Sequence, residues 1–414
     1  MNATNATNVT TGTATAGTQL PATMEPRSLT KHDQRLLSVD LLRGLTIAFM
    51  ILVNDPGDSR VGYAALTHAD WNGFTPTDLV FPTFLFLVGV SLVLSHTRRE
   101  ADGIARGAFL WHALRRTLLL FALGVLLNGF PLYPWRTLRI YGVLQRIAVC
   151  FGIGSLLLAF TRHRKRRILI FSTVLVAVLL GYWLILRFTP VPGHGLPVRD
   201  FPLLDKDVNP VAWLDRKLLP GRLYEHTRDP EGLLSTLPAV GTLILGMLTG
   251  FWLSGMQSAR RKAAGLVAAA LGALLLGGLW NFILPINKKL WTSSYVLWAG
   301  GWSLLILALF FWLCDVKNWR GPGSHGTDGR SRGWTPLLVF GKNAIASYVF
   351  AELLAGCGYF IRIHGQPLSR VVYQRVFAGS GSPAFGSMLF SLFFVAVCWA
   401  PMALLYRRGV FLKL

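Results

Sequence analysis

The feature that most constrains this chain is a series of uninterrupted apolar blocks of bilayer length. Of its 414 residues, 52% are hydrophobic and only 14% are charged, whereas soluble domains carry about a quarter charged residues. A block of roughly 18 or more apolar residues can cross a bilayer as a helix, and a helix satisfies its own backbone hydrogen bonds there. The sequence therefore predicts an all-α, polytopic membrane helical bundle.

The apolar blocks predict about ten membrane-spanning helices. We place them at residues 36–53, 78–96, 110–129, 141–161, 167–188, 234–254, 264–284, 293–314, 335–359 and 384–405. Short loops rich in Arg and Lys gather on the side of the N-terminal segment, and this bias marks the cytoplasmic side. We therefore expect both termini to be cytoplasmic, which agrees with an even number of spans.

Two segments differ from the spans in composition. Residues 1–34 are rich in Thr, Asn and Ala and have no apolar core, so they are predicted to be a disordered cytoplasmic tail rather than a signal peptide. Residues 35–414 then form the transmembrane domain. Its longest loop, about 189–233, is rich in Pro and Gly and is expected on the outer, periplasmic face, where loops of that length carry function or cover a site.

Charge and cysteine content exclude two other classes of protein. The net charge of +22 does not indicate nucleic-acid binding, because the basic residues stand in short loops between spans, where they set topology. The cysteines, Cys150, Cys314, Cys357 and Cys398, are far apart and show no CxxC spacing. They predict neither a metal site nor a disulfide, and are expected to be small apolar packing residues.

Charges inside the predicted spans indicate polar surroundings. Arg139 and Arg146 lie seven residues apart in "RIYGVLQRIAVC", which on one helix is two turns and places both on one face. A bare charge at the depth of Arg146 costs at least ~2.5–3.5 kcal/mol on insertion scales. We expect these arginines to contact a ligand or, alternatively, a structural partner.

Two further charges fall inside the ninth predicted span. Lys342 and Glu352 stand ten residues apart in "GKNAIASYVFAE", about 15 Å along a helix, so they cannot neutralise each other directly. By contrast, Asp40 and Arg43 are three residues apart in the first span, a spacing that predicts a local ion pair.

Two polar groups are predicted at helix starts on the outer face. Lys288 and Lys289 precede Thr292 and Ser293 at the start of the eighth span, which predicts either an anion site or cations that reach the membrane interface. Before the sixth span, Asp229 has the pattern of a helix N-cap, with Pro at the first helical position. Glu231, two residues later, is a candidate ligand contact.

His68 lies in the outer-face block "HADWNGFTPTD". It is followed by Asp70 and by Asp78 at the mouth of the second span. A carboxylate can hold an imidazole in one tautomer, and a neutral imidazole can take a proton from an attacking amine or hydroxyl. His68, with Asp70 or Asp78 orienting its ring, is therefore the candidate general base.

Several blocks together resemble a known family. They are "SVDLLRGLTIAFMILVND", "HADWNGFTPTDLVFPTFLFLVGVS", "RIYGVLQRIAVCFGIGS", "DPEGLLSTLPAVGTLILGMLTG", "PINKKLWTSSYVLWAGG", "GKNAIASYVF" and "LYRRGVFLKL". In this order they resemble the heparan-alpha-glucosaminide N-acetyltransferase family, in its bacterial branch of transmembrane acyltransferases. The resemblance covers nearly the whole chain beyond the tail.

The resemblance implies transfer of an acetyl group from cytosolic acetyl-CoA, without a metal, to an amino sugar on the far side of a bacterial inner membrane. His68 matches the family's catalytic histidine and Asn54, in "VNDPG", its functional asparagine. The segment between them differs from the Gly-rich lysosomal version, which bears on acceptor fit. The candidate acetyl-CoA or acceptor contacts are Arg139, Arg146, Glu231, Lys288, Lys289, Ser293, Lys342 and Asn343. The family also implies a possible homodimer.

Other functions fit parts of the pattern. The same chemistry on a hydroxyl would O-acetylate a cell-envelope polysaccharide, and intramembrane charges also suit a transporter of amino sugars, although no repeat relates the two halves of the chain. A purely structural scaffold has no use for the buried charges. Within the acyltransferase hypothesis, His68 acts either as a base or as a nucleophile that is itself acetylated.

Overall fold

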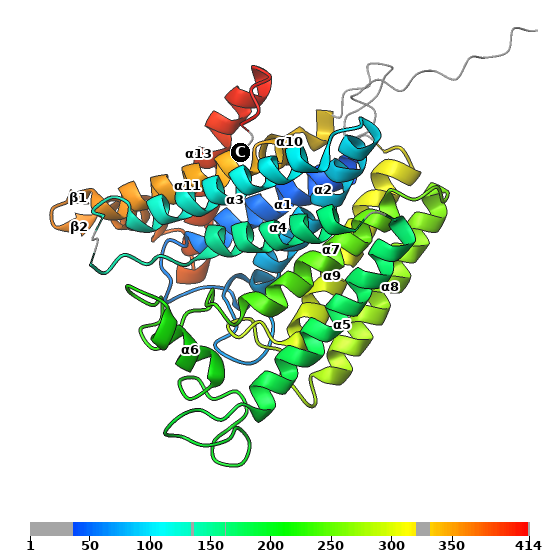
Figure 1. Cartoon of the computed structure of the whole chain (residues 1–414). Helices are drawn as coiled ribbons and strands as arrows, with labels where there is room; N and C mark the ends of the chain where they lie inside the picture. Colours follow the sequence, from blue (N-terminus) through cyan, green and yellow to red (C-terminus); the bar gives the residue numbers. More distant parts are fainter. Residues whose placement is uncertain (1–35, 134–135, 162, 320–331, 413–414) are drawn as a thin grey trace, which may run out of the picture. The chain divides into compact units, whose positions relative to one another are not determined.

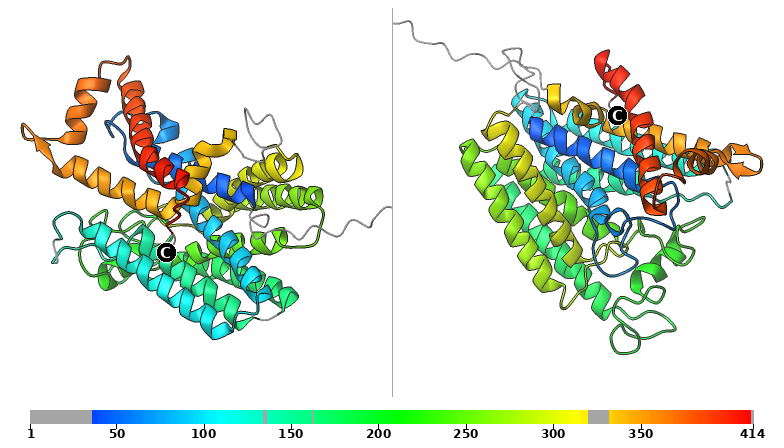
Figure 2. Two further views of the ribbon diagram at one scale, coloured as in Figure 1. Left: turned by 90° about the horizontal axis from the view of Figure 1, so that it is seen from above. Right: turned by 180° about the vertical axis from the view of Figure 1, so that it is seen from behind.

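The structure is a computed structural model that describes residues 36–133, 136–161, 163–319 and 332–412. The predicted tail at residues 1–34 lies outside these residues. The described chain is a helical membrane bundle, which confirms the predicted fold class. Its only strands within those ranges are β1 (Arg362–Ile363) and β2 (Gln366–Pro367), an antiparallel pair that projects away from the helices in Figures 1 and 2.

The helices follow the predicted apolar blocks. The long ones are α1 (Leu37–Asn54), α2 (Val80–Ala101), α3 (Arg106–Gly129), α4 (Val143–Phe160), α5 (Arg164–Phe188), α7 (Thr236–Leu253), α8 (Ala259–Trp280), α9 (Ser293–Phe311), α11 (Ala344–Phe360) and α13 (Pro383–Arg407). The short helical elements are η1 (Ala64–Leu66), η2 (Pro76–Leu79), α6 (Pro210–Leu218), η3 (Trp312–Val316), η4 (Arg332–Trp334), α10 (Thr335–Lys342), α12 (Leu368–Val372) and η5 (Tyr373–Phe377).

The prediction of a continuous ninth span is wrong. In the described ranges, 9 helices are long and apolar enough to cross a membrane, and the tenth candidate is the pair α10 and α11, bent by 86°. The bend falls at Asn343, whose backbone is not helical. Its side-chain oxygen accepts a hydrogen bond from Leu412 N at 3.0 Å. This hydrogen bond holds the bend against the C-terminal segment of the chain.

Close approaches at glycine hold the central helices together. A Cβ at Gly246 on α7 would lie 2.0 Å from the Phe86 carbonyl oxygen of α2, and one at Gly89 on α2 would lie 2.2 Å from Leu243 O of α7. Small residues let helix backbones approach in this way within a bilayer, where apolar burial from water does not drive association. Around this contact the apolar core joins α2, α4, α7 and α9.

The N-terminal half of α1 packs on α10. A Cβ at Gly341 would lie 2.0 Å from Asp40 O. Arg43 pairs with Asp40 at 2.9 Å, which confirms the predicted local ion pair, and it also donates to Gly341 O at 3.2 Å. Lys342 therefore lies beside the first turns of α1, more than two turns away from Asn54 at the other end of that helix.

The connections that carry the candidate residues gather at one end of the bundle. Asn54 ends α1, while α4, α7 and α9 begin at the same end, and the loop with α6 lies beside them (Figure 1). Asn209 caps α6 by accepting from Ala212 N at 2.8 Å, and Pro210 occupies the first helical position. The bias of basic loops to the opposite end predicts that this end faces outward.

Candidate functional site

His68 lies against a buried carboxylate. Its Nδ1 is 2.7 Å from Asp78 Oδ1, and the Asp78 side chain is 1% exposed whereas that of His68 is 43% exposed. Asp78 is fixed by a capping box at the start of η2: its Oδ2 accepts from Thr75 N at 3.0 Å and from Ala69 N at 3.2 Å. A carboxylate that only accepts places the ring proton on Nδ1, which leaves the Nε2 lone pair as the basic one.

Lys288 completes a cluster with His68 and Asp78. Its Nζ lies 2.9 Å from His68 Nδ1, 3.1 Å from His68 Nε2 and 3.6 Å from Asp78 Oδ1. Burial lowers the pKa of Lys288, while the carboxylates of Asp78 and Glu231 oppose that shift. Because it is almost equally far from the two ring nitrogens, the ammonium lies beside the ring between them and not along the axis of the Nε2 lone pair.

The structure separates the two carboxylates proposed to orient His68. Asp70 is 93% exposed and faces Lys206, with 3.3 Å between Asp70 Oδ2 and Lys206 Nζ. Asp78 alone of the two contacts the imidazole. The backbone after Trp71 turns away at Gly73, whose φ is 116°. This conformation suits glycine.

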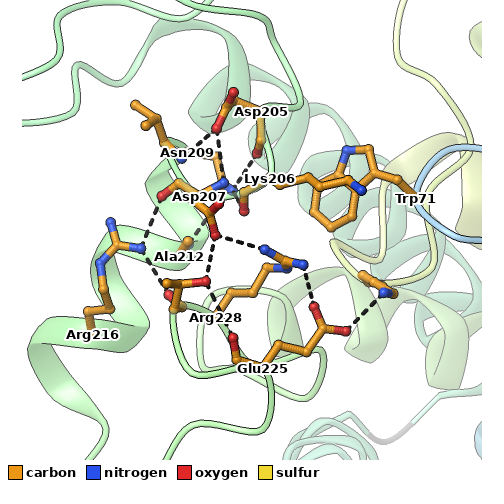
Figure 3. A network of polar contacts seen from close by, with 12 residues as sticks. Trp71, Asp205, Lys206, Asp207, Asn209, Ala212, Arg216, Glu225 and Arg228 are labelled. Carbon is orange, nitrogen blue, oxygen red and sulfur yellow. Dashed lines mark hydrogen bonds and ion pairs between the residues drawn. The ribbon is translucent and has the colours of Figure 1, made fainter.

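The long loop at residues 189–233 holds Trp71 in place. Trp71 Nε1 donates to Leu204 O at 2.7 Å. The guanidinium of Arg228 lies 5.1 Å and the ammonium of Lys206 6.0 Å from its ring, as Figure 3 shows. Glu225 then pairs with both Arg228, at 2.6 Å, and Lys289, at 2.9 Å. These contacts tie the loop to the segments that carry His68 and Lys288.

The predicted shared helix face of Arg139 and Arg146 is wrong, because α4 begins only at Val143. Arg139 lies before the helix and binds two carboxylates: its Nε is 2.9 Å from Asp229 Oδ2, and its Nη2 is 2.7 Å from Glu231 Oε2. The predicted N-cap role of Asp229 is also wrong, since α7 begins at Thr236. Asp229 serves as the bidentate partner of Arg139 instead.

Arg146 is fully buried in α4 and faces the same segment. Its Nη2 donates to Gly232 O at 3.1 Å and to Ser235 Oγ, and its guanidinium lies 5.1 Å from the Trp291 ring. Its Nε and Nη1 have no partner among the described residues, and neither does the amide of the equally buried Gln145. Buried donors without partners are costly, so this is a place where a ligand's oxygen would be stabilised.

Glu231 links the arginines to the His68 cluster. Burial alone would raise the pKa of Glu231, but the positive charges of Arg139, Arg146 and Lys288 hold it below its usual value. Glu231 is therefore ionised, and its charge compensates cations from both clusters. The grouping of Arg139, Arg146, Glu231 and Lys288 at one end of the bundle follows from these interactions.

Asp215 of α6 is a site residue that the sequence did not indicate. It is buried, its Oδ1 accepts from Leu233 N at 2.9 Å, and its Oδ2 has no partner in the described ranges. Burial raises its pKa to about 7. Gly232 permits the approach, since a Cβ there would lie 1.9 Å from Asp215 Oδ2. The sequence does not indicate Asp215 as a site residue, because it meets residues 229–235 only in the folded chain.

The remaining candidates lie apart from the His68 cluster or face other groups. Asn54 is exposed at the last residue of α1, and α1 contacts η2, which carries Asp78. The Ser293 hydroxyl is buried and donates to Leu179 O at 2.7 Å. Lys342 lies over the rings of Tyr406 and Phe411, and Asn343 bonds the chain near Leu412.

No group of three or more His, Cys, Asp or Glu residues in the described part of the chain is placed to hold a metal ion. The side chains gathered at this end of the bundle are an imidazole oriented by a carboxylate, an adjacent ammonium, and a buried guanidinium with unused donors. Such a set suits proton abstraction from a nucleophile beside a stabilised carbonyl or phosphate oxygen.

Comparison with known proteins gives one consistent family. The family described as "Heparan-alpha-glucosaminide N-acetyltransferase, catalytic" matches residues 35–278, which include Asn54, His68, Arg139, Arg146 and Glu231. Heparan-alpha-glucosaminide N-acetyltransferase of Homo sapiens is 31% identical over 370 residues, which cover 77% of this chain and 53% of that protein. The Mus musculus protein of the same name is 29% identical over 393 residues, with 83% and 57% covered.

A bacterial protein also matches. The "Uncharacterized 39.9 kDa protein in amylase 3'region" of Bacillus acidopullulyticus is 30% identical over 174 residues, which cover 41% of this chain and 45% of that protein. The chain spans little more than half the length of the human and mouse proteins. The family match over residues 35–278 includes His68 and Asp78 but ends before Lys288.

Proposed function

The chain belongs to the heparan-alpha-glucosaminide N-acetyltransferase catalytic family, and from this premise we propose that it is a transmembrane acetyltransferase. It transfers the acetyl group of cytosolic acetyl-CoA to the amino group of a glucosamine-like sugar on the periplasmic side of a bacterial inner membrane. The observation that carries the proposal is the contact of 2.7 Å between the half-exposed His68 and the buried Asp78.

In the proposed reaction His68 is the general base. Asp78 keeps the ring proton on Nδ1, so Nε2 can take the proton of the attacking amine as the new C–N bond forms. Lys288 lies 2.9 Å from Nδ1 and 3.1 Å from Nε2, beside the ring, so it does not occupy the axis of the Nε2 lone pair along which the acceptor amine approaches. The buried carboxylate stabilises the imidazolium, which gives this proton to the sulfur of CoA as the C–S bond of the thioester breaks.

Asn54 and Arg146 are proposed to act on oxygen atoms. Asn54, exposed at the end of α1, supplies an amide N–H for the oxyanion that develops on the acetyl carbonyl. Arg146 has two donor nitrogens without partners in the described chain, and these would bind a carbonyl or phosphate oxygen of acetyl-CoA. Three other candidate cations, Arg139, Lys288 and Lys289, are already matched by carboxylates.

Two assays on the purified full-length protein test the proposal. Labelled acetyl-CoA with a panel of amino sugars should give N-acetylated product, and His68→Ala should lower kcat by about 10²–10⁴ while the protein remains folded. Product with His68→Ala at near-normal rate would contradict the assignment of the base. In vesicles, uptake of unmodified amino sugar without acetyl-CoA would instead support a transporter.

A further inference from the structure

A groove of about 440 Å³ lies between the start of α5 and the end of α7. Its lining residues are Arg164, Lys165, Ile168, Ser172, Leu248, Phe251, Trp252 and Gln257. The groove is remote from the proposed catalytic site, because Trp252 and Ser235 lie at opposite ends of α7, roughly 25 Å apart along the helix. None of its residues takes part in the chemistry proposed above.

The groove changes from charged to apolar along its length. Arg164, Ile168 and Ser172 follow one another at intervals of four residues on one face of α5, so the groove runs about 12 Å along that helix. Leu248 and Phe251 line the opposite wall from α7. A charged mouth with an apolar floor of this length has room for a headgroup and the first part of an acyl chain.

The mouth of the groove is cationic. Arg164 Nη2 donates to Phe251 O at 2.6 Å, which fixes its guanidinium at the end of α7, and Lys165 beside it is exposed. Lys262 of α8 adds a third positive charge, since it interacts electrostatically with Arg164. No carboxylate lines the groove among the described residues, so these charges are available to an anion.

Two further features suit a lipid headgroup. Trp252 donates from its Nε1 to Lys262 O at 3.0 Å and exposes part of its ring at the mouth; tryptophan is enriched at the level of the headgroups. Gln257 Oε1 is buried and has no partner among the described residues. It can accept a hydrogen bond from a headgroup hydroxyl.

We propose that this groove binds an anionic phospholipid at the membrane face predicted to be cytoplasmic. The phosphate interacts with Arg164 and Lys165, and an acyl chain follows Ile168, Ser172 and Leu248. Basic pockets between transmembrane helices on that face suit anionic headgroups. A soluble anion would use only the charged mouth and leave the apolar part of the groove exposed to water or to unrelated lipid.

Native mass spectrometry of the delipidated, full-length protein tests this assignment. The probes are phosphatidylglycerol, phosphatidylcholine with the same chains, inorganic phosphate and CoA. We expect retention of phosphatidylglycerol over phosphatidylcholine. Removing two cations in Arg164→Gln/Lys165→Gln should weaken phosphatidylglycerol binding about 25-fold, at roughly fivefold per cation. Arg407→Gln/Arg408→Gln removes two exposed cations outside the groove and should leave binding within about twofold of wild type.

A second variant keeps the test decisive if the charge variant does not fold. Ser172→Phe fills the apolar part without changing charge and should abolish the preference for phosphatidylglycerol. The proposal is overturned by equal retention of the two lipids, by wild-type binding in Ser172→Phe or Arg164→Gln/Lys165→Gln, or by displacement of the lipid by phosphate or CoA alone. None of these outcomes depends on acetyltransferase activity.

Discussion

Replacing Asp78 with Asn should disable the base while leaving its surroundings in place. The Asp78 Oδ2 position accepts hydrogen bonds from the backbone N–H groups of Thr75 and Ala69, at 3.0 and 3.2 Å. An Asn side chain has to keep its oxygen there, so its NH₂ group falls where Oδ1 now faces His68 Nδ1. An NH₂ donor at that position requires Nδ1 to accept, which moves the ring proton to Nε2.

The magnitude follows from that change of tautomer. With Nε2 protonated, His68 cannot take the proton of the acceptor amine, so kcat should fall by about 10²–10⁴. This corresponds to roughly 3–5 kcal/mol at 1.36 kcal/mol per tenfold change. Acetyl-CoA binding and the folded state should change little, because the substitution preserves volume and the hydrogen bond at the start of η2.

Asp70→Asn is the matched control for Asp78→Asn, since it makes the same chemical change two residues from His68. Asp70 is 93% exposed and faces Lys206, and an exposed ion pair contributes about 0–1 kcal/mol. Steady-state kinetics with labelled acetyl-CoA, beside thermal unfolding of each variant, should separate the two. Asp78→Asn with more than half of the wild-type kcat, or an equal loss in Asp70→Asn, would refute the reasoning.

Three further predictions concern stability, measured by thermal unfolding in detergent. Arg139→Met leaves two buried carboxylates without their cation and should destabilise the fold by about 3–5 kcal/mol; an unchanged Tm would contradict the pairing. The pKa of Asp215 is raised to about 7, against about 3.9 in the unfolded chain. The protonated side chain therefore contributes about 4 kcal/mol to the free energy of unfolding below pH 4, and this contribution is lost as the pH rises to 7. Asp215→Asn should therefore flatten the fall in Tm from pH 4 to pH 7, and an identical fall in both proteins would exclude this group. Gly246→Val meets the α2 backbone at 2.0 Å and should lower folded yield sharply, whereas Gly272→Val, with open space around it, should not.

The spans were predictable because the signals that set them are local. Each helix satisfies its hydrogen bonds within itself, and its apolar length is visible in the sequence. The bend between α10 and α11 was not predictable in this way, since the side chain of Asn343 bonds Leu412, 69 residues further along the chain. A span interrupted by a distant polar contact has the same hydropathy as a straight one.

In the candidate site, too, contacts between residues close in the sequence were easier to predict than contacts between distant ones. His68 and Asp78 are ten residues apart in one turn-rich block, and the sequence offered Asp78 and Asp70 as alternative partners of the ring; only Asp78 contacts it. Asp229 was assigned to a helix cap because "DP" is a common helix start, yet its partner Arg139 is 90 residues away. Lys288, 220 residues from His68, was predicted either at an anion site or at the membrane interface, and not beside the imidazole. Residues this far apart in the sequence are brought together by helix packing, so no spacing pattern in the sequence reveals that they pair.

The distribution of charge at this end of the bundle predicts which cation receives acetyl-CoA in the proposed function. Lys289 is matched by Glu225 at 2.9 Å, whereas the hydrogen bonds of Arg146 go to neutral oxygens and two of its donors have no partner in the described chain. Arg146→Gln should therefore weaken acetyl-CoA binding by about 10- to 100-fold, the loss typical of hydrogen bonds from a charged donor. Lys289→Gln, the matched loss of a cation, should leave acetyl-CoA affinity within about twofold of wild type and lower only the Tm, since a partly exposed pair contributes about 0–1 kcal/mol. Isothermal titration of both variants separates these outcomes, and equal losses of affinity would show that the coenzyme is held by the general positive field rather than by the unpartnered guanidinium.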